Sequence, residues 1–215
     1  MPPLQDAFLQ AMRVRRSDIF GHDGDQMPFS EVEDAAIPQV GFLGSEYRRG
    51  GDILMGINPG GGGDTYRRTR EDNALLPLIE LALSGHGTQK DLNSVFETVS
   101  SNMQTWKLWR IVQPVLDAIG KGQSEVAYLN YCPFRTRGDK MPRANAMRNC
   151  KRLLIDPLLT DLAPRRVIAL GKKAGTQLNK YAPELAEVIT VPRTIGDSYI
   201  SAEAQLVLNE LKDMR

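Results

Sequence analysis

The chain has 215 residues, of which 41% are hydrophobic, and this length is enough to bury one sizeable core. Its formal net charge of +1 argues against a protein that coats nucleic acid over its whole surface, but it leaves room for a local basic patch. No apolar run approaches the roughly 18 residues of a membrane span, and the start, MPPLQDAFLQAMRVRR, lacks a run of signal-peptide type. We therefore expect one soluble, cytoplasmic domain over residues 1–215.

The first half of the chain predicts three elements. A helix is expected over residues 3–16, and an irregular segment follows to residue 50. The apolar run at 53–57 predicts a buried strand. Apolar residues then recur every three or four positions, and Gly120 follows where a helix C-cap is expected: Trp106, Trp109, Val112, Leu116 and Ile119. We expect both tryptophans to lie in the core.

The second half continues the alternation. Apolar runs at 126–131, 167–170 and 188–191 predict three more buried strands. A helical stripe runs between the first two, through Ala146, Cys150 and Leu153 or Leu154, until Pro157 disturbs it. A last helix is expected to begin at the N-cap Ser201 and to bury three positions: Ala204, Val207 or Leu208, and Leu211. The two cysteines, Cys132 and Cys150, are expected to be buried free thiols, with no metal site.

Strands that alternate with helices predict a three-layer α/β/α sandwich with a central, mainly parallel, four-stranded sheet. Asn58, Gly171 and Arg193 with its preceding proline follow predicted strands, and Asn130 lies near the end of one. Ligands bind at the carboxyl edge of such sheets, because neighbouring loops diverge there and leave a crevice. The pattern therefore predicts a site at this edge.

The stretch DILMGINPGGGGD, residues 52–64, ends a strand on Asn58, Pro59 and four glycines. Pro59 restricts Asn58 to an extended conformation, and the glycines let a ligand approach the backbone closely. Two interpretations stay open for this segment alone: a preorganised pocket wall, or an ordinary turn between a strand and a loop. A P-loop is excluded, because no Lys-Ser or Lys-Thr follows the glycines.

Three ordered motifs add to this pattern: GINPG at 56–60, Asn130 with the PFR that follows, and VIALGKKAG at 167–175. Together they resemble the uracil-DNA glycosylase superfamily. GINPG is similar to the first active-site motif of its mismatch-specific branch, and the central segment is similar to its thermostable iron–sulfur branch. The resemblance covers roughly residues 51–175 well and the last 40 residues loosely.

The resemblance implies a role for each matching residue. Asn58 would place a water for attack on the sugar carbon, and Asn130 would read a base flipped out of the DNA. An ordinary cap or turn residue is the alternative for Asn130. Tyr66 would stack on the base, or else be an ordinary surface or core tyrosine. Four residues of the first motif would line the substrate site: Gly56, Ile57, Pro59 and Gly60.

The chain also departs from the superfamily pattern. It has no early cysteine, so we expect no iron–sulfur cluster and no other cofactor. Ile57 stands where the iron–sulfur branch carries Glu. The second active-site motif, His-Pro-Ser in most branches, is replaced by VPRTIGDSY at 191–199. Arg193 would then supply a positive charge to the leaving base, and Ile195 or Tyr199 would wedge into the duplex.

Basic residues follow three of the predicted strands, and they would contact DNA phosphates without reading sequence: Arg67, Arg68, Arg70, Arg135, Arg137, Lys140, Arg143, Lys172 and Lys173. Ordinary solvated charge is the alternative. We expect a monomeric, metal-free DNA glycosylase that hydrolyses the N-glycosidic bond of a deaminated base such as uracil. Two other functions stay open: a non-catalytic relative that binds altered bases in DNA, and an enzyme that acts on a free nucleoside or nucleotide.

Overall fold

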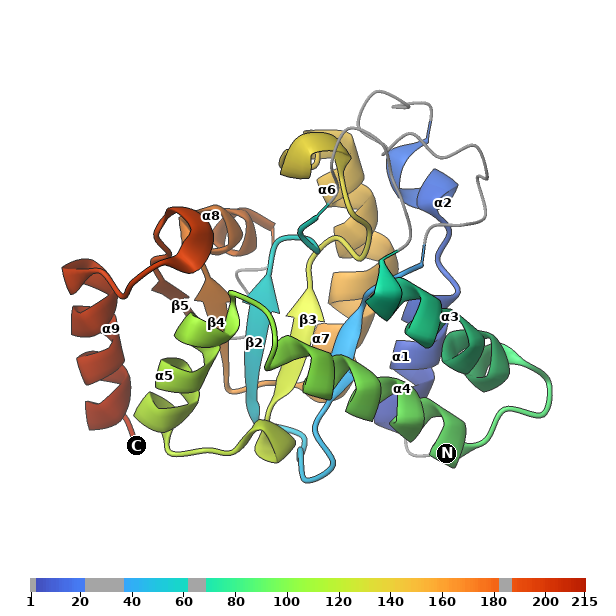
Figure 1. Ribbon diagram of the computed structural model, residues 1–215, viewed down its shortest axis with the longest axis horizontal. Helices are drawn as coiled ribbons and strands as arrows, with labels where there is room; N and C mark the ends of the chain where they lie inside the picture. Colours follow the sequence, from blue (N-terminus) through green and yellow to red (C-terminus); the bar gives the residue numbers. More distant parts are fainter. Residues whose placement is uncertain (1–2, 22–36, 62–68, 182–186) are drawn as a thin grey trace.

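A computed structural model describes residues 3–21, 37–61, 69–181 and 187–215, and a central sheet crosses its middle (Figure 1). Five strands pair in the order β1-β3-β2-β4-β5. They are β1 (Gly41–Leu43), β2 (Asp52–Gly56), β3 (Ala127–Asn130), β4 (Arg166–Leu170) and β5 (Glu187–Val191). All neighbours run parallel except β1, which pairs antiparallel with β3. The four predicted strands are therefore present, but β5 lies at the sheet edge and is buried only at Val191, so the prediction that it is a buried strand is wrong. The predicted number of strands is also too low by one, because the short strand β1 pairs with β3.

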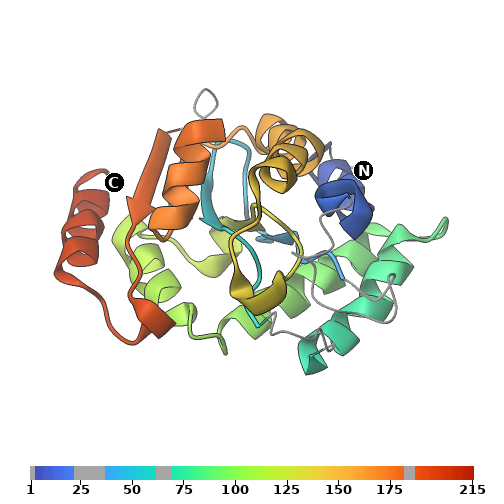
Figure 2. The same cartoon turned by 90° about the horizontal axis from the view of Figure 1, so that it is seen from above.

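Helices cover both faces of this sheet, as Figure 2 shows, with α4 and α5 on one face and α6, α7 and α8 on the other. The α-helices are α1 (Pro3–Met12), α2 (Arg16–Phe20), α3 (Arg70–Leu83), α4 (Gln89–Met103), α5 (Trp109–Ile119), α6 (Ala144–Cys150), α7 (Asp156–Leu162), α8 (Lys172–Tyr181) and α9 (Ala202–Asp213). Short turns of 3-10 helix lie at η2 (Gln123–Glu125), η3 (Arg137–Asp139) and η5 (Ile195–Asp197). Within the described ranges, no helix is long and apolar enough to cross a membrane.

The first predicted helix is two helices in the structure. The chain leaves the helical conformation after Met12, and the carboxylate of Asp18 accepts a hydrogen bond from the Arg15 amide at 2.8 Å. An acid that binds the N-cap amide starts a new helix, so α2 begins at Arg16. The prediction of one helix over residues 3–16 is wrong at this point.

The helix predicted from Trp106 begins only at Trp109. Its buried stripe and its end are as expected, since Gly120 adopts the left-handed conformation of a C-cap with φ 67°. Both tryptophans are partly buried and pack against the core, so the expectation that they belong to it is confirmed only in part, and Trp106 lies before the helix. This tryptophan becomes part of the site described below.

Pro157 disturbs its helix in a specific way. A proline removes a backbone donor and its ring presses on the carbonyl four residues earlier. One turn of π-helix, η4 (Lys151–Ile155), lies directly before α7 and accommodates the proline. Ala146, Cys150 and Leu154 keep their buried positions through this turn, and both cysteines are buried free thiols as predicted. Ser201 caps α9 as predicted, because its hydroxyl accepts from the Ala204 amide at 3.1 Å.

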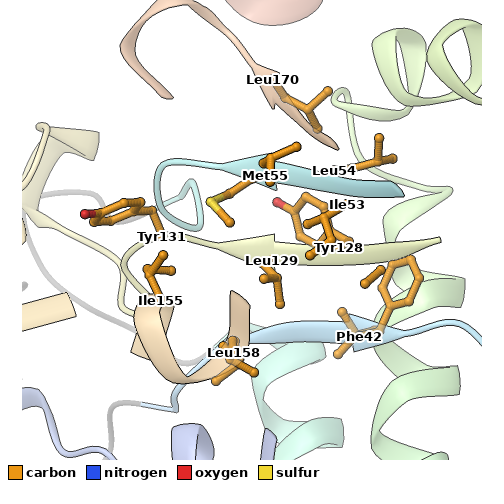
Figure 3. Close-up of a cluster of buried hydrophobic side chains, with 14 of the residues drawn as sticks. Phe42, Ile53, Leu54, Met55, Tyr128, Leu129, Tyr131, Ile155, Leu158 and Leu170 are labelled. Carbon is orange, nitrogen blue, oxygen red and sulfur yellow. The ribbon is translucent and has the colours of Figure 1, made fainter. Parts of the chain in front are cut away.

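The core lies between the sheet and its helices, and Figure 3 shows side chains of β2 and β3 packed against Phe42, Ile155 and Leu158. Strands β2, β3 and β4 are buried along their whole length. Buried hydrophobic residues from α1 to α9 form one continuous cluster. The sheet is therefore fixed on both faces, and the residues at its carboxyl edge start from rigid positions.

Candidate active site

A cavity of about 580 Å³ opens at the carboxyl edge of the sheet. Its volume falls in the range of roughly 300–1,000 Å³ that is usual for ligand pockets. Residues from the ends of β2 and β3, the start of α3, the α4–α5 connection and the segment after β5 line it: Gln39, Gly56, Asn58, Pro59, Gly60, Gly61, Thr69, Arg70, Glu71, Trp106, Lys107, Leu108, Tyr128, Asn130, Arg135, Arg193 and Asp197. The cavity therefore lies where parallel sheets usually bind ligands.

Asn58 lies two residues after the end of β2, and its side-chain nitrogen is hydrogen-bonded within the protein. Its Nδ2 donates to Thr136 Oγ1 at 3.2 Å and to the Pro59 carbonyl at 3.3 Å. Thr136 is buried, and its hydroxyl donates in turn to the carbonyl of Lys140. Because the nitrogen is engaged, the Oδ1 atom is left as the acceptor that Asn58 offers to the cavity.

Asn130 is buried at the end of β3 and is held at both ends of its side chain. Its Nδ2 donates to the Gln39 carbonyl at 2.8 Å, and its Oδ1 accepts from the Tyr128 hydroxyl at 2.9 Å. Burial raises the pKa of that hydroxyl far above its ordinary value, more than the positive charge of Arg193 lowers it, so Tyr128 remains a donor. Asn130 keeps one N–H and one lone pair for a ligand.

Gly56 makes room for this pair on the neighbouring strand. It lies opposite Asn130 in the parallel register of β2 and β3. A Cβ atom at Gly56 would lie 3.0 Å from the Tyr128 hydroxyl and 3.2 Å from Asn130 Oδ1. A side chain here would therefore push against the two groups that line the floor of the cavity.

Beneath the cavity, Asp72 ties three segments together and is fully buried. One carboxylate oxygen accepts from Gln39 Nε2 at 2.6 Å and from the Arg135 guanidinium at 3.3 Å, and the other accepts from the Thr69 amide at 2.9 Å. Gly61 adopts φ +82°, and a Cβ there would come within 3.2 Å of the Arg135 guanidinium. Arg135 is thus clamped between α3 and the glycine loop, and its side chain is only 10% exposed.

Arg193 enters the cavity from the end of β5. Its guanidinium binds the Asp197 carboxylate through two hydrogen bonds of 2.8 and 2.5 Å. Arg110 adds a hydrogen bond to the Asp197 carbonyl at 3.4 Å. The charge of Arg193 is therefore already matched by an acid within the site.

Trp106 and Glu71 form a wall of the same cavity. The indole Nε1 of Trp106 lies 3.0 Å from each oxygen of the Glu71 carboxylate. The indole ring meets the Tyr128 ring edge-on, with 6.4 Å between the ring centroids. An aromatic surface and a carboxylate are thus held in fixed relation to one another.

The remaining predicted site residues are distributed as follows. Tyr66, Arg67 and Arg68 lie outside the described residues. Ile57 packs against the core and is absent from the described lining of the cavity, although its carbonyl accepts from the Cys132 amide at 2.8 Å. Tyr199 is exposed over 67% of its surface, beyond η5, whose first residue is Ile195.

The predicted phosphate-contacting residues differ in their surroundings. Arg137 begins η3, and exposed Lys140 and Arg143 follow it on the way to α6, outside the described lining of the cavity. Lys172 pairs with Glu203 of α9 at 2.7 Å, although both side chains stay well exposed. Arg70 lines the cavity itself.

Sequence reasoning missed several residues that shape the site: Gln39, Glu71, Trp106, Tyr128, Thr136 and Asp197. One of them had a usable sequence pattern, because Tyr128 stands two positions before Asn130 on a strand and so shares its face. Glu71 comes from the first turn of α3 and the others come from connections, and their positions follow from packing, with no local pattern that marks them.

Comparisons with known proteins add no family assignment. No protein-family model matches the chain, and no curated protein matches it at a significant level.

Proposed function

We propose that the protein is a DNA N-glycosylase that takes a deaminated base such as uracil into this cavity and hydrolyses its N-glycosidic bond. One observation carries the proposal. Three predicted site residues, Asn58, Asn130 and Arg193, leave three different strands and line one cavity at the carboxyl edge of a mostly parallel sheet flanked by helices. The α/β/α arrangement expected from the alternation of strands and helices agrees with this placement.

Asn58 places the attacking water in this proposal. Its amide is fixed through Thr136, so its Oδ1 accepts a hydrogen bond from the water in a constant direction. An amide is a poor base, but a glycosidic transition state with positive charge on the sugar gains much from placement of the nucleophile alone.

Asn130 reads the base. Its remaining N–H and lone pair match a ring N–H beside a carbonyl oxygen, which is the edge that uracil presents. Gln39 and Tyr128 fix the direction of both groups. Cytosine offers an exocyclic amine and an unprotonated ring nitrogen on the same edge, so Asn130 in this orientation discriminates against it.

The surface around the cavity meets the DNA. Lys140 and Arg143 would contact phosphates, and the exposed ring of Tyr199 would fill the gap that a flipped base leaves in the duplex. Arg137, Arg67 and Arg68 would contact further phosphates, and Ile195 would wedge into the duplex. The proposed reaction uses no metal or other cofactor.

One observation favours a second function, a non-catalytic protein that binds altered bases in DNA. Arg193, which would stabilise the leaving base anion, already carries two hydrogen bonds to Asp197. Because its charge is already balanced by Asp197, Arg193 would stabilise the anion of the leaving base less strongly. This function keeps the base-reading role of Asn130 and drops the role of Asn58.

The test uses an end-labelled duplex with one uracil opposite guanine and its thymine-containing control. The purified protein is incubated with each, alkali is added to break the strand at any site without a base, and complex formation is followed by mobility shift. Alkali-sensitive breaks at uracil only support the glycosylase. Selective binding of the uracil duplex without breaks supports the binding protein instead.

A further inference from the structure

The acids in and next to the cavity differ in how far their carboxylates are engaged by basic residues. Asp197 is bound by Arg193, and Asp72 lies below the cavity in the grip of Gln39, Arg135 and the Thr69 amide. Glu71 is the remaining acid of the described lining. Among the residues that the structure describes, its hydrogen-bond partner is the neutral N–H of Trp106, and no described cation forms an ion pair with it.

The position of Glu71 is well defined. It is the second residue of α3, inside the capping box that Thr69 and Asp72 form. The Trp106 N–H bridges both carboxylate oxygens and fixes the plane of the group. A carboxylate has about four acceptor positions, so Glu71 keeps acceptor capacity for a molecule in the cavity.

We propose that Glu71 is the general base of the glycosylase reaction; the inference rests on the function proposed above. The water held by Asn58 forms a bond from its oxygen to the sugar carbon. The bond between that carbon and the base nitrogen breaks, and its electron pair leaves with the base. The proton that the water loses goes to a carboxylate oxygen of Glu71, which Asn58 cannot replace because an amide does not take up a proton at neutral pH.

The first test is Glu71→Gln, measured by single-turnover base release from uracil-containing DNA across a range of pH. The amide keeps the size and the acceptor for Trp106 but cannot accept the proton. We expect release to slow by about a hundredfold to a thousandfold, and the decline of the wild-type rate at low pH to vanish. Glu80→Gln is the matched control, since Glu80 is an exposed acid on the same helix.

The second test is Trp106→Phe, which removes the N–H and keeps an aromatic ring. Without this N–H the plane of the Glu71 carboxylate is no longer fixed, so base release should slow by about tenfold or more although Glu71 itself is unchanged. The charged groups around the cavity stay unchanged in this variant: Arg70, Asp72, Lys107, Arg135, Arg193 and Asp197. If Trp106 had only a structural role, the variant would unfold at a lower temperature but its folded form would release the base at the wild-type rate.

The outcomes separate this inference from the proposed function. The role of Glu71 would be overturned if the wild type releases the base and Glu71→Gln releases it at a rate within threefold, with the same pH dependence. The proposed glycosylase activity would then still hold. Absence of release by the wild type from any altered base would overturn both. Thermal unfolding and binding of uracil-containing DNA are measured on each variant, so that a folding defect is recognised. If Glu71→Gln does not fold, Glu71→Asp is tested in its place. The aspartate keeps a carboxylate, so the decline of the rate at low pH should remain.

Discussion

Thr136 fixes the direction of the Asn58 amide, and its hydroxyl is itself fixed by the Lys140 carbonyl. Thr136→Val keeps the shape of the side chain but removes this hydroxyl. We expect base release to slow by about tenfold to a hundredfold, because the water is no longer held in one direction, while KM changes little. Thr136→Ser restores the hydroxyl and should restore the rate, and single-turnover kinetics of both variants measure this. A slow serine variant beside a fast valine variant would contradict the role of the hydroxyl.

At the scale of elements, strands β2 and β4 begin at a buried ion cluster. Asp52 is fully buried and accepts hydrogen bonds from Arg165 and Arg166 at 2.9 and 2.8 Å, with Lys121 at 3.3 Å. Asp52→Asn leaves buried Arg166 without its counter-charge. We expect the free energy of unfolding to fall by about 3–5 kcal/mol, measured by urea denaturation at pH 7. A loss below 1 kcal/mol would show that water or another acid replaces Asp52.

The same cluster predicts how stability depends on pH. Burial by itself raises the pKa of Asp52, but hydrogen bonds from Arg165 and Arg166 outweigh burial and hold the pKa below its ordinary value of 3.8. The stabilisation from Asp52 is therefore complete above the unfolded-state pKa and is lost as the pH falls through the lower folded-state pKa. Urea denaturation between pH 6 and pH 2.5 should show this loss in the wild type and a smaller one in Asp52→Asn.

Helix α8 packs on the sheet through a glycine. A Cβ atom at Gly175 would lie 1.9 Å from Thr190 Oγ1 of β5. Gly175→Ala should therefore push α8 from β5 and lower the free energy of unfolding by about 1–3 kcal/mol, measured by thermal and urea denaturation. Gly85→Ala serves as control, because Gly85 has open space around its Cβ position. Equal stability of both variants would contradict the close packing.

Across the whole molecule the net charge is only +1, but four basic residues line the cavity: Arg70, Lys107, Arg135 and Arg193. DNA binding should weaken as salt rises, and Lys140→Ala should reduce the slope of log K against log salt by about 1. Lys90→Ala, an exposed lysine on α4, should leave the slope unchanged. Fluorescence anisotropy with a labelled duplex measures both, and equal slopes in all three proteins would remove Lys140 from the DNA surface.

The parallel strands were predictable because each carries a short apolar run, although the edge strand β5 is only partly buried. The antiparallel strand β1 was missed, since its three residues carry too short a pattern and the surrounding segment is irregular. The site was predictable where residues lie at the end of a strand or shortly after it, as Asn130, Asn58 and Arg193 do. Glu71 and Trp106 reach the cavity because α3 and the α4–α5 connection fold over it, and no local pattern encodes that course.

In the proposed reaction Asn58 places a water for hydrolysis of a base from DNA, and the variant Asn58→Ala tests that role. Wild type and Asn58→Ala are incubated side by side with an end-labelled duplex that carries one uracil opposite guanine, and alkali reveals each lost base. We predict breaks with the wild type and a rate at least about a hundredfold lower in the variant, the scale of lost water placement. Equal rates of breakage in the two proteins would contradict the account.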